Sequence, residues 1–321
     1  MREELQKASN IIKKGGLVIF PTETVYAIGA NGLDKNAVEK IYKAKKRNRF
    51  NPINLLVSDI KMIESITKDI TDIEYKLIQK FFPGPLTIIL NKKECIPDIV
   101  TAGNSTVGIR MPANKIALDL IKLTGVPIAA PSANISGKLS GTNIDDIKED
   151  FTGKVNLIID GGESKIGIES TIVKVIDNVI HVLRPGAITK DELESIAEVS
   201  LDYEKERNEE LPSSNLLHYR IKTKAIVMYN ENNKEMIDCI NNELKKYDNP
   251  IMLSSNENAR FYNTKNIIEI GSKNDLEEIS RNIFKNLKKA DEMKMDIIII
   301  EGVQEKGIGI AIMDRIRKIC V

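Results

Sequence analysis

A short apolar run followed by a polar, glycine-containing stretch constrains the fold of this chain more than any other feature. Leu17 to Phe20 is bounded by a glycine and a proline, which predicts a short buried strand. The stretch that follows reads PTETVYAIGANGLDKNAVEKIYKAKKRNRFNP. Thr24 stands just past the strand's end, where open sheets that combine strands and helices place their ligands. Gly29 and Gly32 predict a loop before the next helix, because glycine tolerates irregular backbone conformations.

That helix carries the most informative basic residue of the stretch. Asp34 is expected to cap it, and Val38, Ile41 and Tyr42 fall on one apolar face. Lys45 follows Val38 at i+7, in register with this face, unlike its basic neighbours. Its ammonium therefore either enters a cleft at the helix end or reaches solvent past a buried stem. Spacing alone favours the solvated arrangement.

Composition excludes several classes of protein. The 321 residues suggest two domains, and 47 Lys+Arg against 46 Asp+Glu give no overall charge that would favour nucleic acid. Three scattered cysteines show no zinc spacing and suit a reducing compartment. No apolar run has the length of a membrane span, and the first residues, MREELQKASN, are polar, unlike a signal peptide. We therefore expect a cytoplasmic protein without a membrane partner.

Further along the chain, apolar runs and helical patterns mix without regular strand–helix alternation, which predicts an α+β or mixed α/β domain with a largely antiparallel, twisted sheet. Strands are expected at 53–57, 86–90, 107–111, 127–130, 155–159, 170–176 and 179–183, and helices at 1–14, 69–82 and 114–123. Residues 200–222 are polar and charged, as in a linker. Beyond them, regular alternation predicts a small parallel three-layer domain. Its strands are expected at 225–229, 251–254, 267–270 and 297–300, and its helices at 234–246, 274–289 and 308–319.

Six separate blocks carry a resemblance to a known family. PTETVYAIGAN, followed by Lys45-x-Arg47 and Asn51-Pro52, resembles the signature of the threonylcarbamoyl-AMP synthase family, whose catalytic part is the YrdC-like domain. The segments PGPLTIIL, TVGIRMP, PIAAPSANISG, GIESTIV and VLRPGAI resemble the family's other blocks, in the same order. The tail resembles the smaller C-terminal domain of the family's long members.

The resemblance implies a fold and a domain division. It implies an α/β protein, with a YrdC-like twisted mixed sheet and helices in residues 1–200 and a Rossmann-like parallel α/β domain in residues 223–321. Residues 201–222 would be a linker and an active-site lid.

The resemblance also implies an activity. L-Threonine, bicarbonate and ATP would give threonylcarbamoyl-AMP and pyrophosphate, for the N6-threonylcarbamoyladenosine modification of tRNA. ATP is then a substrate, with Mg²⁺ held mainly by its phosphates and no metal site of the protein's own. The expected partners are these substrates, the downstream tRNA threonylcarbamoyl transferase machinery and, weakly, tRNA itself.

Matched positions within the blocks imply the site residues. Lys45 and Arg47 would be catalytic, neutralising charge that develops on the phosphates. Threonine would be bound by Thr24, Arg110, Ala130 and Ser170. ATP would be bound by Arg47, Asn51, Thr106, Ser132, Ser140, Arg184 and Tyr219. Arg110 is the natural partner of the threonine carboxylate, because a guanidinium binds a carboxylate in a bidentate manner.

Other interpretations and some departures stand beside this one. The five basic residues between Lys43 and Arg49 also suit a non-catalytic protein that binds double-stranded RNA or tRNA. A carbamoyl-transfer module, like the YrdC-like part of hydrogenase-maturation enzymes, is a third reading. The chain departs from the family at Leu56, where long members often carry histidine, and at Arg220-Ile221, where the family often has Ala-Pro.

Overall fold

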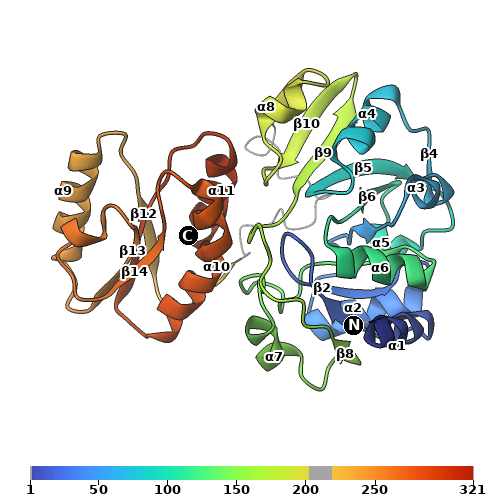
Figure 1. Cartoon of the computed structure of the whole chain (residues 1–321), viewed down its shortest axis with the longest axis horizontal. Helices are drawn as coiled ribbons and strands as arrows, with labels where there is room; N and C mark the ends of the chain where they lie inside the picture. Colours follow the sequence, from blue (N-terminus) through green and yellow to red (C-terminus); the bar gives the residue numbers. More distant parts are fainter. Residues whose placement is uncertain (1, 202–218, 321) are drawn as a thin grey trace.

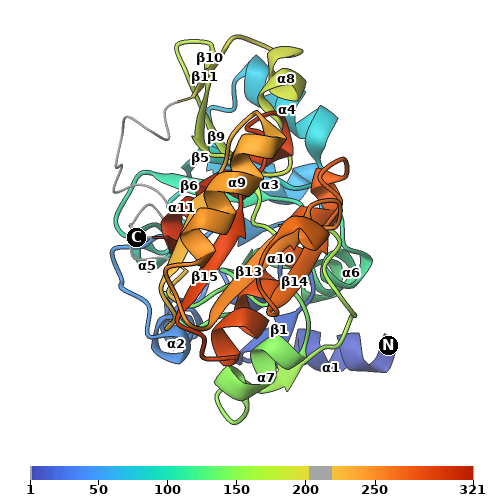
Figure 2. The same cartoon turned by 90° about the vertical axis from the view of Figure 1, so that its left-hand side faces the viewer.

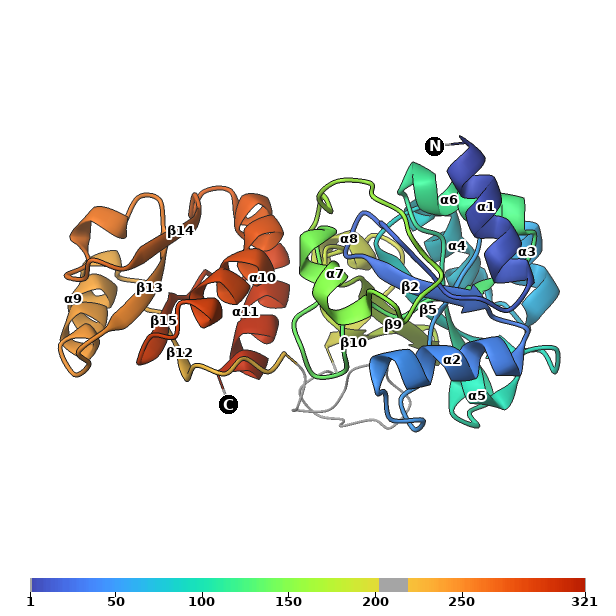
Figure 3. The same ribbon diagram turned by 90° about the horizontal axis from the view of Figure 1, so that it is seen from below.

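Two β-sheets with their helices organise the chain, and helices of the C-terminal part face the N-terminal part (Figure 1). The structure is a computed structural model and describes residues 2–201 and 219–320. Seen from below, α10 and α11 lie between the C-terminal sheet and the N-terminal part (Figure 3). Most of the expected linker and lid, residues 202–218, lies outside the described residues.

The first sheet has the order β11-β10-β9-β5-β6-β3-β7-β2-β1-β8, with β4 paired to β5. Its strands are β1 Val18–Phe20, β2 Ala27–Asn31, β3 Leu55–Leu56, β4 Thr67–Lys68, β5 Leu86–Lys92, β6 Thr106–Arg110, β7 Ile128–Ala129, β8 Leu157–Ile158, β9 Thr171–Ile176, β10 Val179–Arg184 and β11 Val199–Leu201. The pairs β1–β8, β3–β6, β5–β9 and β10–β11 are parallel, and the other pairs are antiparallel. The expectation of a mixed, largely antiparallel sheet is confirmed.

Helices cover both faces of this sheet. The helices are α1 Arg2–Lys13, α2 Lys35–Lys45, α3 Ile60–Ile66, α4 Asp72–Phe81, α5 Asp98–Thr101, α6 Lys115–Thr124, α7 Asp145–Phe151 and α8 Lys190–Glu194. One apolar cluster joins α1 and α6 to the sheet, and a larger one joins α2, α3, α4 and α7 to it. Asp34 caps α2 as expected, since its carboxylate accepts hydrogen bonds from the amides of Asn36 and Ala37.

The loop expected around Gly29 is instead a strand. Residues 27–31 form β2, which pairs with β1 and β7. A side chain at Gly29 would place its Cβ 2.5 Å from a ring carbon of Phe20 and 2.8 Å from the side chain of Ile128. This glycine therefore allows close packing of neighbouring strands, and it does not loosen the backbone.

The C-terminal sheet is wholly parallel, with the order β12-β15-β13-β14. Its elements are β12 Ala225–Met228, α9 Asn233–Leu244, β13 Pro250–Ser255, the 3₁₀ turn η1 Ala259–Phe261, β14 Ile267–Gly271, α10 Leu276–Glu292, β15 Ile297–Glu301 and α11 Ile308–Ile319. One apolar cluster lies on the side of α10 and α11, and another on the side of α9. Figure 2 shows this part from its outer side. The expected three-layer arrangement is confirmed.

Within residues 2–201 and 219–320, the structure contains no helix that is both long and apolar enough to cross a membrane.

Candidate active site

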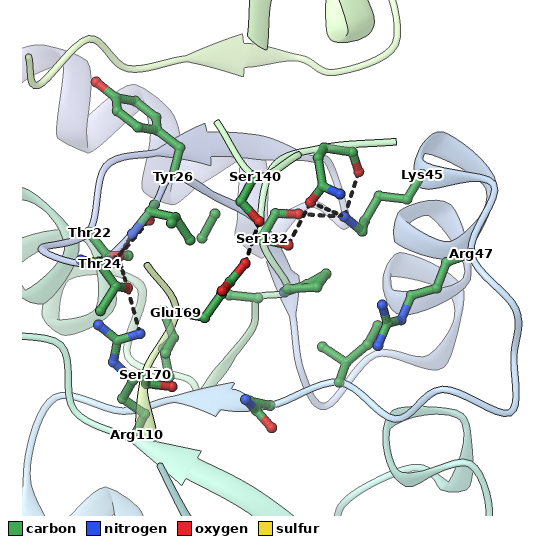
Figure 4. Close-up of a pocket in the computed structure, with 18 of the residues that line it drawn as sticks. Thr22, Thr24, Tyr26, Lys45, Arg47, Arg110, Ser132, Ser140, Glu169 and Ser170 are labelled. Carbon is green, nitrogen blue, oxygen red and sulfur yellow. Dashed lines mark hydrogen bonds between the residues drawn. The ribbon is translucent and has the colours of Figure 1, made fainter. Parts of the chain in front are cut away.

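A polar pocket lies where several strands of the first sheet end together (Figure 4). β6 and β10 end at Arg110 and Arg184, and β9 begins just after Ser170. Because β9 runs antiparallel to β10 and parallel to β5, while β5 runs antiparallel to β6, these ends share one edge of the sheet. The helix α2 delivers Lys45 to the same pocket.

The loop between β1 and β2 forms one wall. Thr22 fixes its shape, since its hydroxyl donates to the carbonyl of Val25 at 2.6 Å and accepts from the amide of Thr24 at 3.2 Å. The hydroxyl of Thr24 in turn accepts a hydrogen bond of 2.9 Å from Nη1 of Arg110. Two expected threonine-binding residues therefore meet directly.

Arg110 keeps part of its guanidinium available. Its Nη2 lies 2.7 Å from Oε1 of Glu23, an ion pair between two buried side chains. The pair lacks hydrogen-bond geometry, and Nη2 makes no hydrogen bond within the described residues. Burial acts to raise the pKa of Glu23, but the charge of Arg110 and hydrogen bonds to the carboxylate together hold that pKa below its usual value. A charged, incompletely bonded guanidinium suits a carboxylate ligand.

Ser170 and Arg184 form a second wall. Nη2 of Arg184 donates to the carbonyl oxygen of Ser170 at 2.8 Å and to its hydroxyl at 3.1 Å. The Ser170 hydroxyl also lies 2.8 Å from the hydroxyl of Thr87. Burial lowers the pKa of Arg184 to about 10, which leaves the side chain charged at neutral pH.

Lys45 is buried, which overturns the solvated arrangement favoured by spacing alone. Its side chain is only 1% exposed, and its ammonium donates to the carbonyl oxygens of Ser132 at 2.5 Å and Asn134 at 2.6 Å. Burial lowers the pKa of Lys45 well below its usual value, and the nearby charge of Arg47 lowers it further. The ammonium of Lys45 therefore lies at the pocket without hydration to stabilise its charge.

The pocket brings together most of the expected site residues. Those that line it are Thr24, Lys45, Arg47, Arg110, Ala130, Ser132, Ser140, Ser170, Arg184 and Tyr219. The guanidinium of Arg47 donates to the carbonyl oxygens of Asn51 at 3.1 Å and Pro52 at 2.8 Å. Asn51 thus contributes its backbone to the placing of Arg47 and does not itself line the pocket.

Thr106 stands apart from this group. It begins β6, at the opposite end of that strand from Arg110, and lines a smaller adjoining recess. The two cavities share only Pro52 to Asn54. Position within a matched block did not reveal that Thr106 and Arg110 lie at opposite ends of the same strand.

Several lining residues escaped sequence reasoning, among them Tyr26, Asn54, Ser136 and Glu169. The clearest missed signal is Glu169, an acidic residue in the largely apolar segment GIESTIV. Its carboxylate accepts a hydrogen bond of 2.6 Å from the hydroxyl of Ser140. Asn54 and Ser136 each bury a side-chain oxygen that makes no hydrogen bond within the described residues, so both have capacity for a ligand.

Tyr219, the first described residue after position 201, also lines the pocket. Its ring stacks on Phe284 of α10, with centroids 5.3 Å apart, and the residue is 3% exposed. Its φ of 68° is a left-handed conformation that is uncommon for tyrosine. Surrounding contacts therefore hold Tyr219 firmly between the pocket and the C-terminal helices.

In the part of the chain that the structure describes, no three His, Cys, Asp or Glu side chains gather as they would around a metal ion. The two carboxylates nearest the pocket, Glu23 and Glu169, each pair with an arginine.

Comparison with known proteins matches the two parts of the chain to two family descriptions. Residues 10–186 match the family described as "Telomere recombination", and residues 188–319 match the family described as "Threonylcarbamoyl-AMP synthase, C-terminal domain". A threonylcarbamoyl-AMP synthase of Pyrococcus abyssi is 40% identical, over 98% of this chain and 93% of the relative. One of Bacillus subtilis is 36% identical, over 98% and 92%. The crystal structure of P. abyssi Sua5 complexed with L-threonine superimposes with a TM-score of 0.92 at 37% identity, covering 100% of this chain and 95% of that one.

Proposed function

The chain belongs to the threonylcarbamoyl-AMP synthase family, in its long form, and we infer that it makes threonylcarbamoyl-AMP and pyrophosphate from L-threonine, bicarbonate and ATP. It is an enzyme that transfers a nucleotidyl group. The reading as a non-catalytic RNA binder gives way to this activity. Of the exposed cations in this stretch, Lys43 and Arg49 both lie against the carboxylate of Glu39, which offsets part of their positive charge.

The observation that carries this function is the convergence of cations from separate segments on one pocket. Lys45 and Arg47 come from the end of α2, Arg110 from β6 and Arg184 from β10. A site that must hold a triphosphate, a carboxylate and a carbamate together needs such fixed positive charge. Hydroxyls and backbone groups between the cations supply the directional hydrogen bonds.

Threonine would bind at the wall formed by Thr24, Arg110 and Ser170. Nη2 of Arg110, which is ion-paired with Glu23 but makes no hydrogen bond within the described residues, would donate to the carboxylate, and Thr24 would be held in place by the same guanidinium. The backbone around Ala130 would complete this subsite, since small side chains there let a ligand approach closely. The relative's threonine-bound structure supports threonine as the amino acid substrate.

ATP would lie along Arg47, Ser132, Ser140 and Arg184, with Tyr219 closing its side. Because both nearby carboxylates are paired with arginines, Mg²⁺ would enter with the phosphates and be held mainly by them. Asn51 would act through Arg47, because its backbone carbonyl accepts a hydrogen bond from the Arg47 guanidinium. Thr106 would belong to the adjoining recess.

The reaction would proceed without a protein nucleophile. Bicarbonate would take up a proton and lose water to give carbon dioxide, and the neutral amine of threonine would then add to carbon dioxide, giving a carbamate and releasing a proton. A carbamate oxygen would then attack the α-phosphate, and pyrophosphate would leave. The protein's part is to position the reactants and neutralise charge, with Lys45 and Arg47 facing the phosphates.

We further propose the division into a catalytic domain at 1–200, a linker at 201–222 and a C-terminal domain at 223–321. The second family match begins earlier, at residue 188. The pairing of β10 with β11 favours the later boundary, because it joins residues 199–201 to the first sheet. The product would pass to the downstream tRNA threonylcarbamoyl transferase machinery, with weak tRNA binding by this chain.

The decisive experiment measures pyrophosphate release by the full chain. Release should require threonine, bicarbonate and ATP together, and the product should have the mass of threonylcarbamoyl-AMP. Release that needs ATP alone would contradict the assignment. A structure with ATP and threonine bound would test the residue roles one by one.

A further inference from the structure

The segment Ile166 to Glu169 lies between the pocket and the C-terminal helices. On the pocket side, the amides of Ile166 and Gly167 donate to the carbonyl oxygens of Glu23 and Thr24 at 2.9 and 3.0 Å. On the other side, the hydroxyl of Ser280, in α10, donates to the carbonyl of Ile166 at 2.6 Å. This segment thus contacts the expected threonine-binding loop and the C-terminal part at once.

Arg315 of α11 reaches across the same boundary. It is 0% exposed and is among the largest fully buried side chains of the described residues. Its Nε lies 2.9 Å from Oε2 of Glu169, and its Nη2 donates to the carbonyl of Pro185 at 2.9 Å. Its Nη1 pairs with Asp314 on the same helix. One guanidinium from the C-terminal part therefore ties two separate segments of the N-terminal part.

Both segments end in pocket residues. Glu169 uses its other oxygen, Oε1, to accept the hydrogen bond from Ser140. Pro185 directly follows Arg184, whose guanidinium faces Ser170. Arg315 is therefore linked through one intervening residue to each of two groups expected to bind ATP. Glu169 links it to Ser140, and Pro185 links it to Arg184.

We propose that Arg315 is a positioning residue for the ATP half of the active site. It fixes the carboxylate of Glu169, which orients the hydroxyl of Ser140, and it fixes the backbone that carries Arg184. The C-terminal part thereby takes part in catalysis through the nucleotide subsite. This inference rests on the proposed roles of Ser140 and Arg184 in binding ATP.

A purely adhesive role would not need this chemistry. Ile168 is fully buried in the apolar cluster of the C-terminal part, and Tyr219 stacks on Phe284, so apolar contacts already join the two parts. A buried ion pair adds little stability over apolar side chains of similar volume. The guanidinium adds direction instead, because its planar fork fixes the orientation of a carboxylate and a carbonyl together.

The charge of Glu169 depends on this arrangement. Burial acts to raise its pKa, but Arg315 first and Arg184 second hold that pKa down at about 2, with help from the Ser140 hydroxyl. The titratable and charged groups that influence this cluster come from every packed element: Arg315, Asp314 and Lys318 of α11, Arg184 of β10, Arg110 of β6, Lys45 of α2 and Tyr219 before β12. Without Arg315, the buried carboxyl would bind a proton at a higher pH, and a protonated Glu169 would hold Ser140 differently.

The test compares Arg315→Met with the wild-type full chain in steady-state kinetics. Threonine and ATP are each varied, and pyrophosphate release is followed between pH 5 and 9. We expect KM for ATP to rise at least about tenfold while KM for threonine changes less than about threefold. The acid limb of kcat/KM for ATP, which the low pKa of Glu169 keeps below this pH range in wild type, should rise into the range in Arg315→Met, because the buried carboxyl loses its main cation. Calorimetry with a non-hydrolysable ATP analogue should show the same loss of affinity.

The matched control is Arg317→Met. Arg317 lies on the same helix, is 52% exposed and pairs with Glu305 through Nη1 at 2.7 Å. Its substitution should leave both KM values and the acid limb unchanged. Arg315→Lys, which retains the charge but not the fork, should fall between wild type and Arg315→Met in ATP affinity.

A double variant separates positioning from folding. Arg315→Met combined with Glu169→Gln removes both buried charges, so its thermal midpoint should recover relative to Arg315→Met alone. Its KM for ATP should stay high. If ATP affinity returns with stability, or if Arg315→Met keeps the wild-type KM for ATP, the positioning role is wrong. If the wild-type chain itself releases no threonine-dependent pyrophosphate, the proposed function fails instead.

Discussion

The ammonium of Lys45 lies 2.5 Å from the carbonyl oxygen of Ser132, although 87 positions separate the two residues in the chain. The end of a helix and the end of a strand are thereby joined through one buried cation. Because the acceptor is a backbone carbonyl and not a carboxylate, the charge is oriented but not neutralised. The other two N–H donors of the ammonium go to the carbonyl and the side-chain oxygen of Asn134, so Lys45 would act on incoming phosphates through its positive charge.

Lys45 should give the reaction an alkaline limit. Since burial first and Arg47 second lower its pKa, kcat/KM for ATP should decline below the pH at which an ordinary lysine loses its proton, about 10.4. In Lys45→Arg the limit should move upward, because a guanidinium keeps its proton in that range. Lys45→Met should reduce kcat by about a hundredfold or more. An alkaline limb at the same pH in wild type and Lys45→Arg would assign the limit to another group.

Arg110→Ala should raise the threonine requirement more than the ATP requirement. Loss of a charge-assisted carboxylate contact costs about 2–4 kcal/mol, or roughly 30- to 1000-fold in KM. The variant also leaves Glu23 buried without its cation, so the pKa of that carboxyl should rise above its unfolded value. The variant's loss of stability relative to wild type should therefore be largest near neutral pH and shrink as pH falls and Glu23 becomes protonated.

The double variant Arg110→Ala with Glu23→Gln is the control for that stability effect. It should regain thermal stability at neutral pH while the threonine KM remains high. Kinetics with each substrate varied in turn decide the matter. A threonine dependence equal to that of wild type would remove Arg110 from this role.

Tyr219→Ala should uncouple ATP consumption from product. We expect the variant to bind threonine but to lose net threonylcarbamoyl-AMP, with ATP converted to AMP, because water reaches the labile mixed anhydride. Tyr219→Phe retains the ring that stacks on Phe284 and should separate packing from the hydroxyl. Chromatography of AMP and product over time is the measurement. Equal product accumulation in Tyr219→Ala and wild type would contradict a lid role and leave the expected linker, residues 201–222, as a tether only.

Gly167→Ala should weaken the contact between the two parts of the chain. A Cβ at this position would lie 2.3 Å from the carbonyl oxygen of Ser280 and 2.5 Å from Cα of Arg281, both backbone atoms of α10. Gly153→Ala is the matched control, since its φ is +78° against +85° at Gly167 but nothing lies within 4 Å. The control should lose about 1 kcal/mol from backbone strain alone, and Gly167→Ala clearly more. Equal thermal midpoints for the two variants would mean that α10 can shift to accommodate the added methyl group at little cost in stability, which would contradict the prediction.

Sequence patterns predicted the long elements well, because amphipathic helices and buried strands impose their period on many residues. Asp34 caps α2 as its position suggested. Elements of few residues, such as α5, α7 and β4, gave no period long enough to recognise. The strand β2 was not predicted because Gly29 was read as a loop residue. The glycine is required because the ring of Phe20 on the neighbouring strand leaves no room for a side chain.

The candidate site was predictable where matched blocks named its residues, but its geometry was not. Spacing placed Lys45 on the apolar face of a helix without revealing that backbone carbonyls of residues 132–134 surround its charge. Glu169 and Arg315 lie 146 positions apart, and no local pattern relates them. Such pairs follow from the packing of two separate sheets, which one-dimensional periodicity does not encode.

The burial of Ile168 in the apolar cluster of the C-terminal part bears on how such chains can recombine. A crossover between relatives near residue 200 would transfer the C-terminal part without the side chain that completes its interior, and without the carboxylate that receives Arg315. The unit that must be inherited together is therefore discontinuous in sequence: it is the C-terminal part together with the short segment around Ile168 and Glu169 of the N-terminal part. Chimaeras that exchange both pieces should tolerate divergence that a single crossover does not.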